Sequence, residues 1–408
     1  MTNKRKIIND PVYGFLTIED DIIFDVIAHP FFQRQRRIKQ LGFSELVYPG
    51  AVHTRFSHML GALNLMNRAV EVLKVKGVDI TPDEILGVKL AILLHDIGHG
   101  PFSHTSECVL ADVPHETLTL LFMNRLNEEF NGQLSTAIAI FADTYPQHFL
   151  HQLVSSQLDM DRLDYLSRDS FFTGVCEGIV GTERIINMLN VHNDELVVDE
   201  KGIYSIEKFI ISRRLMYWQV YLHKTVIAAD TLLLGILRRV RELCASSADS
   251  MLQNNTPLMD FLSHRYTQWD FENDPSLLNH FALLDDTDVI AAIKGWMSHD
   301  DVILRTLSER LINRRLPAVM VRDRSFSPEE VEEYRQQVQQ QYGISPQESE
   351  YFVGVGVLKN HAYDFNDPEI RVRYKNGNCQ DISEASDQLD RHFLEKQVTK
   401  YYIFYPKK

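Results

Sequence analysis

The chain has 408 residues, a formal net charge of −14, 44% hydrophobic residues and 24% charged residues. This length is enough for two or more domains with a sizeable buried core, and the composition is typical of a globular protein. The acidic balance argues against a broad basic surface for nucleic acid. It is compatible with a phosphorylated substrate, because a bound metal ion and a few arginines dominate the field of a local pocket.

Signals for export or membrane insertion are not evident. The stretch MTNKRKIINDPVYG is charged and then turn-forming, and no segment approaches the apolar length of a membrane span. The four cysteines are scattered without paired spacing: Cys108, Cys176, Cys244 and Cys379. Such spacing favours reduced thiols, so we expect a cytoplasmic protein without a membrane partner.

The predicted elements begin with a short hairpin and continue as helices. Residues 6–18 predict the hairpin, because Asp10-Pro11 and Gly14 punctuate this extended stretch. From about Glu19 to Pro317 the pattern is mostly helical. Within it, Thr81-Pro82-Asp83-Glu84 predicts a helix start, with an N-cap threonine and a glutamate three residues later. That helix carries His95-Asp96 at its carboxyl end, where glycines and a proline stop it.

Beyond residue 320 the spacing of apolar residues is no longer mainly that of helices. Ser327-Pro328 opens another helix, which reaches Gln341. Strands are predicted over Tyr351–Leu358, Ile370–Tyr374 and Tyr401–Tyr405, and Asn376-Gly377 is a hairpin-turn signal. We therefore predict a mostly α protein, with a helical domain over residues 1–320 and a small α+β lobe over residues 321–408.

Four segments of the helical region carry side chains suited to a metal ion. They are His53–His58, His95-Asp96, Pro114–Glu116 and Leu158–Asp169. The pair His95-Asp96 follows four apolar residues, where polar groups carry a desolvation cost unless they are paired or metal-bound. Imidazole and carboxylate ligands suit Fe, Mn, Zn, Ni or Mg and leave the identity of the metal open.

The last of these segments also has an ordinary interpretation. Asp161, Tyr165 and Asp169 recur every four residues, so they form one polar stripe that suits a pocket wall. Asp164 and Arg168 are spaced as an ordinary ion pair along a helix. A lone histidine in a helical protein is more often a hydrogen-bonded core or surface residue than a ligand, so the metal hypothesis depends on the grouping.

Together these segments resemble the HD superfamily of metal-dependent phosphohydrolases. The finer match is to the deoxynucleoside triphosphate triphosphohydrolase branch, in a form without a SAM domain. The stretches that carry it are FFQRQRRIKQLG, RFSHMLG, LLHDIGHGPFSH, His115-Glu116, DMDRLDYLSRD and YLHK. The resemblance implies a helical HD core and hydrolysis of dNTPs to deoxynucleoside and inorganic triphosphate, through attack of water or hydroxide on the α-phosphorus.

The same resemblance implies the metal and catalytic residues. One divalent ion is expected on His58, His95, Asp96 and Asp161. His115 is expected to act as the general acid with Glu116 orienting it, and His99 to lie beside the α-phosphate with Glu107 as its orienting carboxylate.

Substrate contacts follow from the resemblance as well. Arg55 and Arg162 are expected on the phosphates. The sugar and base are expected to meet Gln40, Leu41, Tyr165, Asp169 and Tyr221, with His104 in the pocket wall. In this branch Arg162 is often a lysine, which keeps the charge but changes the geometry.

The resemblance also implies a homo-oligomer, a dimer or tetramer, and a nucleotide-activation site. Asn9, Gln33 and Arg36 occupy matching positions, but Ala28 replaces an aspartate that reads guanine in the family. Gln33 and Arg36 fit a solvated helix face equally well.

Two alternatives stay open at this stage. The first is an HD phosphohydrolase acting on another nucleotide, such as a monophosphate, a cyclic nucleotide or a signalling nucleotide. The second is a catalytically silent regulator that binds nucleotides or nucleic acid. A local basic run, Arg34–Lys39, favours the regulator, whereas the complete set of expected ligands and His115-Glu116 opposes it.

Overall fold

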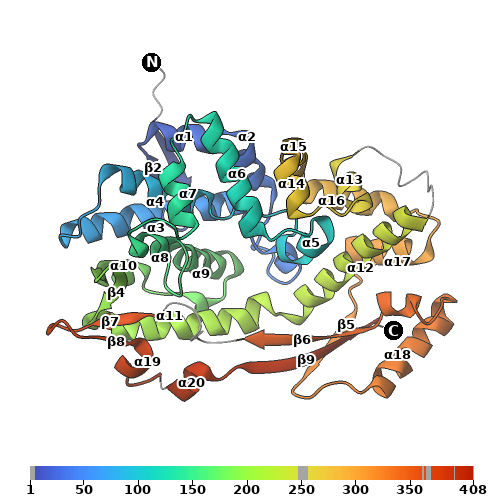
Figure 1. The fold of residues 1–408 in the computed structure, drawn as a ribbon. Helices are drawn as coiled ribbons and strands as arrows, with labels where there is room; N and C mark the ends of the chain where they lie inside the picture. Colours follow the sequence, from blue (N-terminus) through green and yellow to red (C-terminus); the bar gives the residue numbers. More distant parts are fainter. Residues whose placement is uncertain (1–4, 247–255, 361–362, 364–368, 390, 408) are drawn as a thin grey trace.

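The computed structural model describes residues 5–246, 256–360, 363, 369–389 and 391–407, without the side chains of residues 104, 108 and 393. It is mostly α, as predicted, with two small sheets at the lower side of the helical body in Figure 1 and the β1–β2 hairpin at its upper left. The helices are α1 (Asp21–Ala28), α2 (Pro30–Gln33), α3 (Arg55–Val75), α4 (Pro82–Leu94), α5 (Ser103–Leu110), α6 (His115–Glu129), α7 (Ser135–Phe141), α8 (His148–Val154), α9 (Met160–Thr173), α10 (Thr182–Met188), α11 (Ile203–Met216), α12 (Lys224–Ser246), α13 (Pro257–Ser263), α14 (Gln268–Asn273), α15 (Pro275–Phe281), α16 (Asp286–Trp296), α17 (Val302–Ile312), α18 (Pro328–Tyr342), α19 (Ile382–Ala385) and α20 (Arg391–Glu395).

Short turns and strands complete the described chain. The turns of 3₁₀ helix are η1 (Arg34–Arg37), η2 (Gly42–Leu46), η3 (Cys176–Gly178), η4 (Glu200–Gly202) and η6 (Glu348–Tyr351), and η5 (Tyr217–Tyr221) is a π-helical turn. The strands are β1 (Lys6–Asp10), β2 (Gly14–Ile18), β3 (Leu189–His192), β4 (Glu195–Asp199), β5 (Ala318–Arg322), β6 (Gly354–Asn360), β7 (Arg371–Arg373), β8 (Cys379–Asp381) and β9 (Val398–Tyr405).

The predicted N-terminal hairpin is confirmed. β1 and β2 pair in antiparallel register from Lys6↔Ile18 to Asp10↔Gly14. Gly14 has a φ of +79°, a backbone conformation that glycine adopts without steric cost. Leu16 and Ile18 are buried in the main core, so apolar contact fastens the hairpin to the helices.

Helix α4 also begins as predicted. Thr81 Oγ1 accepts a hydrogen bond from the Glu84 backbone N–H at 3.3 Å, and the Glu84 carboxylate accepts from the Thr81 N–H at 2.7 Å. This capping box satisfies two N-terminal donors of the helix. The helix buries Leu93 and Leu94 completely, and His95 forms its C-cap. The apolar run therefore places His95 at the edge of the core.

The sheets combine distant parts of the chain. β5, β9 and β6 form one antiparallel sheet, and β3, β4, β7 and β8 form another. In the second sheet β7 runs parallel to β4, with Val198 opposite Val372. The segments β3 and β4 lie in the region predicted as mostly helical, so their strands were missed. The division at residue 320 stays a prediction.

The C-terminal elements follow their signals with shifted ends. Helix α18 begins at Pro328 as predicted. Strand β6 begins only at Gly354, because the preceding residues form the turn η6. Asn376-Gly377 connects β7 to β8, as the turn signal predicts, and Gly377 has a φ of +87°.

Two further expectations concern cysteines and membranes. Cys176, Cys244 and Cys379 are free thiols, as predicted, and the side chain of Cys108 lies outside the described residues. Within the described ranges no single helix has the length and hydropathy to cross a membrane, and one bent pair, Glu200–Tyr221 with Lys224–Ser246, passes that test by length and composition alone.

The loop after α4 lies directly against α6. The Gly98 backbone N–H donates to Thr119 Oγ1 at 3.1 Å, and Thr119 Oγ1 donates to the His95 carbonyl at 3.2 Å. A Cβ on Gly98 would come within 2.3 Å of the His115 carbonyl and 2.4 Å of the Thr119 nitrogen. Only a residue without a side chain permits this approach.

We therefore expect Gly98→Ala to lower the free energy of unfolding by about 1–3 kcal/mol, because backbone atoms must move apart. Gly295→Ala is the matched control, since a Cβ there has no atom within 4 Å and lies inside a helix. That change is expected to raise stability by up to about 1 kcal/mol. Urea unfolding of both variants measures the difference, and equal stabilities would contradict the packing argument.

Candidate active site

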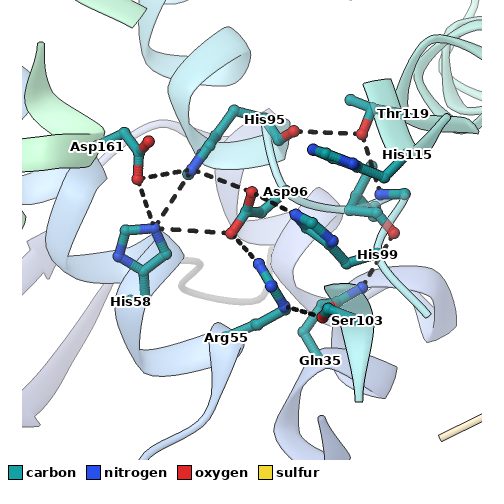
Figure 2. Close-up of polar contacts among 12 residues, drawn as sticks. Gln35, Arg55, His58, His95, Asp96, His99, Ser103, His115, Thr119 and Asp161 are labelled. Atoms are coloured by element: carbon teal, nitrogen blue, oxygen red, sulfur yellow. Dashed lines mark hydrogen bonds and ion pairs between the residues drawn. The ribbon is translucent and has the colours of Figure 1, made fainter. Parts of the chain in front are cut away.

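Three helices bring the predicted metal ligands together. His58 lies on α3, His95 at the C-cap of α4 and Asp161 in the first turn of α9, and Figure 2 shows their side chains converging. His58 Nε2 lies 3.0 Å and His95 Nε2 3.3 Å from Asp161 Oδ1. His58 is fully buried, whereas the Asp161 side chain is 28% exposed. The cluster therefore opens to solvent on the Asp161 side.

Second contacts fix the orientation of both imidazoles. His58 Nδ1 donates to Asp164 Oδ2 at 2.7 Å, and His95 Nδ1 donates to the Ile92 carbonyl at 2.6 Å. Each ring thereby turns Nε2 into the cluster, where the two Nε2 atoms are 3.3 Å apart. Two nitrogen lone pairs this close repel each other unless a cation or a proton lies between them. The donor set fits a divalent metal ion.

Asp96 lies at the border of the cluster. Its carboxylate is 3.8 Å from His58 Nε2 and 3.6 Å from His95 Nε2. One oxygen accepts from the Arg55 guanidinium, and the other lies 3.2 Å from His99 Nε2. Asp96 thus joins the ligand cluster to the residues beside it (Figure 2).

The electrostatics of the cluster favour positive charge. Burial alone would lower the pKa of His58, but hydrogen bonds and charges from Asp161 and Asp164 raise it to about 10. The pKa of Asp161 falls despite burial, because His95 and His58 stabilise its anion. Without a metal ion the carboxylates hold a proton on the imidazole; a divalent cation satisfies the same need.

The pair Asp164–Arg168 is present, but it is not an ordinary surface pair. Both side chains are fully buried, and Arg168 contacts Asp164 at 2.9 and 3.1 Å. Arg168 also donates to Asp10 Oδ2 at 2.7 Å. Burial of this pair was not evident from spacing, since the same interval occurs on solvated helices.

A second group of titratable residues adjoins the cluster. The rings of His99 and His115 stack with centroids 3.9 Å apart. Burial and the nearby Arg55 lower the pKa of His99 to about 3, whereas Glu107 and Glu116 raise the pKa of His115 against the effect of burial. The stack therefore combines a neutral ring with a readily protonated ring, which avoids repulsion between two imidazolium groups.

Glu107 contacts a different histidine from the one expected. Its carboxylate accepts from the His115 backbone N–H at 2.8 Å and from His115 Nδ1 at 2.9 Å, and these bonds lower its pKa to about 2. The sequence predicted Glu107 beside His99; the short loop between α5 and α6 instead brings it to the first residue of α6. Glu116 lies 3.3 Å from His115 Nε2 and is mostly exposed.

The residues expected around the sugar lie on three segments. Asp169 is buried and accepts from Tyr221 at 2.7 Å and from His53 Nε2 at 2.8 Å. Tyr165 and Tyr221 have ring centroids 6.2 Å apart. Gln40 Oε1 is buried without a hydrogen-bond partner. A buried amide oxygen of this kind indicates a missing donor.

His53 is a residue of this region that the sequence did not assign individually. Its carbonyl accepts from the Gln40 N–H at 3.0 Å, its ring stacks on Phe172, and its Nδ1 is buried without a partner. The signal available was its position in the segment that leads to Arg55 and His58. The approach of α9 to this segment, which gives His53 its carboxylate partner, is a tertiary feature.

The remaining predicted contacts are only partly described. Arg55 is buried and donates to Ser103 Oγ at 3.0 Å as well as to Asp96. Arg162 contacts Asp159, the N-cap of α9, at 3.3 Å. Leu41 is partly buried against the core, and the side chain of His104 lies outside the described residues.

The residues expected at a nucleotide-activation site lie on β1, α2 and η1 and contact one another only in part. Gln33 donates to the Ile27 carbonyl at 2.7 Å and accepts from Arg36 Nε at 2.9 Å. Asn9 pairs with Phe15 in the hairpin. Arg36 is exposed, and its guanidinium covers the Phe56 ring at 3.5 Å.

The basic run Arg34–Lys39 does not form a basic patch. Arg34 is 1% exposed and donates to the carbonyls of Leu284 and His99. Arg37 pairs with Asp285, and Lys39 pairs with Glu45. Three of the four cations in the run are thus buried or paired with an acid, and Arg36 alone is exposed without an acidic partner among these contacts. This weakens the support that the run gave to a nucleic-acid partner.

Comparisons with known proteins agree with this geometry. A family model described as HD domain matches residues 55–169, and one described as HD associated region matches residues 180–265. The uncharacterised protein YwfO of Bacillus subtilis is 33% identical over 99% of this chain and 93% of its own length. The chain therefore belongs to the HD domain family of phosphohydrolases, whose members bind divalent metal ions.

Two further relatives differ in how much they cover. The crystal structure of a phosphohydrolase from Bacteroides thetaiotaomicron has a TM-score of 0.95 and 49% identity, over 99% of this chain and 100% of that chain. The deoxynucleoside triphosphate triphosphohydrolase SAMHD1 homologue of Dictyostelium discoideum is 31% identical over 54% of this chain and 46% of its own length. This chain therefore spans less than half of that relative.

We expect Asp164→Asn to weaken metal affinity by about 10–100-fold, because the amide no longer fixes His58 as a carboxylate does. Calorimetric titration of the metal-stripped protein with Mn²⁺ measures the change. Asp112→Asn is the control, since Asp112 forms an exposed pair with Arg265 outside the cluster. Equal affinities in the two variants would contradict the role assigned to Asp164.

Proposed function

We propose that the protein hydrolyses deoxynucleoside triphosphates to a deoxynucleoside and inorganic triphosphate. The observation that carries this proposal is the placement of the His115–Glu107 pair against His99, which in turn contacts the border ligand Asp96. A group able to donate a proton thus adjoins a cluster able to hold a metal ion. The dNTP assignment is supported by the activity for which the Dictyostelium relative is named and by the sugar-facing set that the family resemblance implies.

The roles of this chain's residues follow from their contacts. His58, His95, Asp96 and Asp161 would hold the metal ion, which supplies an activated water and charge neutralisation for the phosphoryl oxygens. Arg55, fixed by Asp96 and Ser103, adds a buried positive charge beside the cluster.

His115 has the features of a general acid. Glu107 accepts from Nδ1 and stabilises the protonated ring, so the proton on Nε2 is available to the leaving 5′-oxygen of the nucleoside. The neutral ring of His99 stacks on His115 and donates from Nε2 to Asp96, which keeps that carboxylate in place. Protonation of the leaving oxygen is needed because a 5′-alkoxide is a poor leaving group.

The unsatisfied amide oxygen of Gln40 supports a ligand that carries a hydroxyl group. Gln40 Oε1 is buried and has no donor, while Asp169 is held by His53 and Tyr221. A sugar 3′-hydroxyl supplies one donor and would satisfy such an acceptor. A 3′,5′-cyclic deoxynucleotide has no free sugar hydroxyl, so this acceptor favours an open 3′ position over a cyclic deoxynucleotide.

We expect the metal-loaded protein to release inorganic triphosphate from a panel of dNTPs and to lose this activity on treatment with EDTA. Chromatography of the products separates triphosphate, pyrophosphate and phosphate. Release of pyrophosphate or phosphate alone would exclude the proposed cleavage between the α-phosphorus and the 5′-oxygen. Turnover of monophosphates or cyclic nucleotides with no dNTP turnover would favour an HD phosphohydrolase that acts on another nucleotide.

We expect His115→Ala to lower kcat by about 10²–10⁴-fold, the usual contribution of a general acid, while retaining dNTP binding. Single-turnover hydrolysis and equilibrium dNTP binding measure the two properties. Hydrolysis at the wild-type rate would remove the proposed role of His115. Loss of hydrolysis together with binding would point to a structural role instead.

The pH dependence gives a further test. His115 must be protonated to act as an acid, so activity falls as pH rises through its raised pKa. Glu107→Gln removes the principal partner that raises this pKa, and the alkaline limb of kcat/KM should move to lower pH. Glu116→Gln is the matched control, because Glu116 is largely exposed at 3.3 Å from the same ring and should give a smaller shift. An unchanged alkaline limb in Glu107→Gln would contradict the assignment.

A further inference from the structure

We propose that the N-terminal hairpin, residues 6–18, is a clamp on the metal centre. In this clamp Asp10 and Arg168 are positioning residues that hold Asp164, and through it His58, in the metal-binding orientation. The inference rests on the metal centre of the proposed function and extends it to a segment that is remote from the ligands in the sequence.

A continuous line of buried polar contacts carries this inference. Asp10 Oδ2 accepts from Arg168 Nη1 at 2.7 Å, and Arg168 Nε donates to Asp164 Oδ2 at 2.9 Å. The same oxygen of Asp164 accepts from His58 Nδ1 at 2.7 Å. The side chains of Arg168, Asp164 and His58 are fully buried, and that of Asp10 is 4% exposed. Water therefore cannot replace a lost partner easily.

Asp10 joins this line to the backbone of the hairpin. Its second oxygen, Oδ1, accepts from the backbone N–H groups of Val12 and Tyr13 at 2.9 and 3.0 Å. One carboxylate thus holds the hairpin turn with one oxygen and Arg168 with the other. A change in the hairpin turn must move the oxygen that Arg168 contacts.

A glycine in α3 provides the space for the ion pair. A Cβ on Gly61 would lie 2.1 Å from Arg168 Nη2 and 2.1 Å from Asp164 Oδ1. Gly61 follows His58 by one helical turn, so α3 presents a ligand and, beside it, a gap that Asp164 and Arg168 fill. The pair is therefore pressed against the ligand helix, which limits the positions that Asp164 can take.

The hairpin is expected to affect metal binding, and metal binding is expected to affect the docking of the hairpin. If the hairpin favours the metal-binding orientation of His58, metal binding must stabilise the docked hairpin by the same free energy. Leu16 and Ile18 keep the hairpin on the core by apolar burial that does not involve Asp10. Loss of the ionic contact should therefore loosen the hairpin without unfolding the protein.

The test compares Asp10→Asn, Arg168→Lys and the control Asp20→Asn in the full chain. Asparagine retains the acceptor for the turn and replaces the negative oxygen that Arg168 contacts, while lysine cannot bridge both carboxylates as the guanidinium does. Asp20 lies in the same N-terminal region but forms a partly exposed pair with Lys89 at 3.1 Å. Circular dichroism melts establish that each variant is folded.

Two measurements then apply to the metal-stripped proteins: Mn²⁺ affinity by calorimetry, and hydrogen exchange of peptides covering residues 6–18 with and without Mn²⁺. We expect about tenfold weaker Mn²⁺ binding in Asp10→Asn and Arg168→Lys, with no change in Asp20→Asn. We also expect Mn²⁺ to slow exchange of the hairpin in the wild type and much less in Asp10→Asn.

Three results would overturn the inference. Wild-type affinity in a folded Asp10→Asn, or hairpin exchange that is independent of Mn²⁺ in the wild type, would remove the clamp and leave the metal centre intact. A wild-type chain that binds no Mn²⁺ would overturn both the clamp and the proposed metal centre. If Arg168→Lys does not fold, Asp10→Asn alone decides the result.

Discussion

The hydrogen bond from His58 to Asp164 is the contact on which the site depends. It sets which nitrogen of His58 faces the cluster, and it places a carboxylate in the interior between α3 and α9. A buried carboxylate is costly unless it is paired and hydrogen-bonded, and Arg168 supplies the charged partner of Asp164. Arg168 in turn requires Asp10, and the pair requires the gap at Gly61. The orientation of His58 thus depends on contacts among α3, α9 and the N-terminal hairpin.

A different set of contacts holds the loop that carries His99. The Arg34 guanidinium donates to the carbonyls of Leu284 and His99. Asp286, at the start of α16, accepts from the backbone N–H of Phe102 and Lys39 at 2.9 Å each. Segments from the first and the last third of the chain therefore fix the loop that carries His99. These contacts hold the His99 ring in position against His115 and Asp96.

Local signals predicted much of the fold. Helix α4 with its capping box, the hairpin and the start of α18 all follow from N-cap and turn residues, whose preferences act within a few positions. The pairing of Glu107 with His115 and the burial of Arg34 did not follow, because both depend on segments that approach only in the folded chain. Strands β3 and β4 form a local hairpin around Asn193-Asp194, both with positive φ, and this turn signal was overlooked. Only the pairing of β4 with β7 depends on a segment far along the sequence.

That parallel pairing also has a consequence for biosynthesis. Strand β4 pairs with β3, its neighbour in the sequence. The other edge of β4 pairs with β7, which leaves the ribosome only after most of the chain has been made. Pairings across so long a span form late, because the entropy of closing the loop must be overcome first. During translation, the open edge of β4 is therefore available for pairing with strands of other chains.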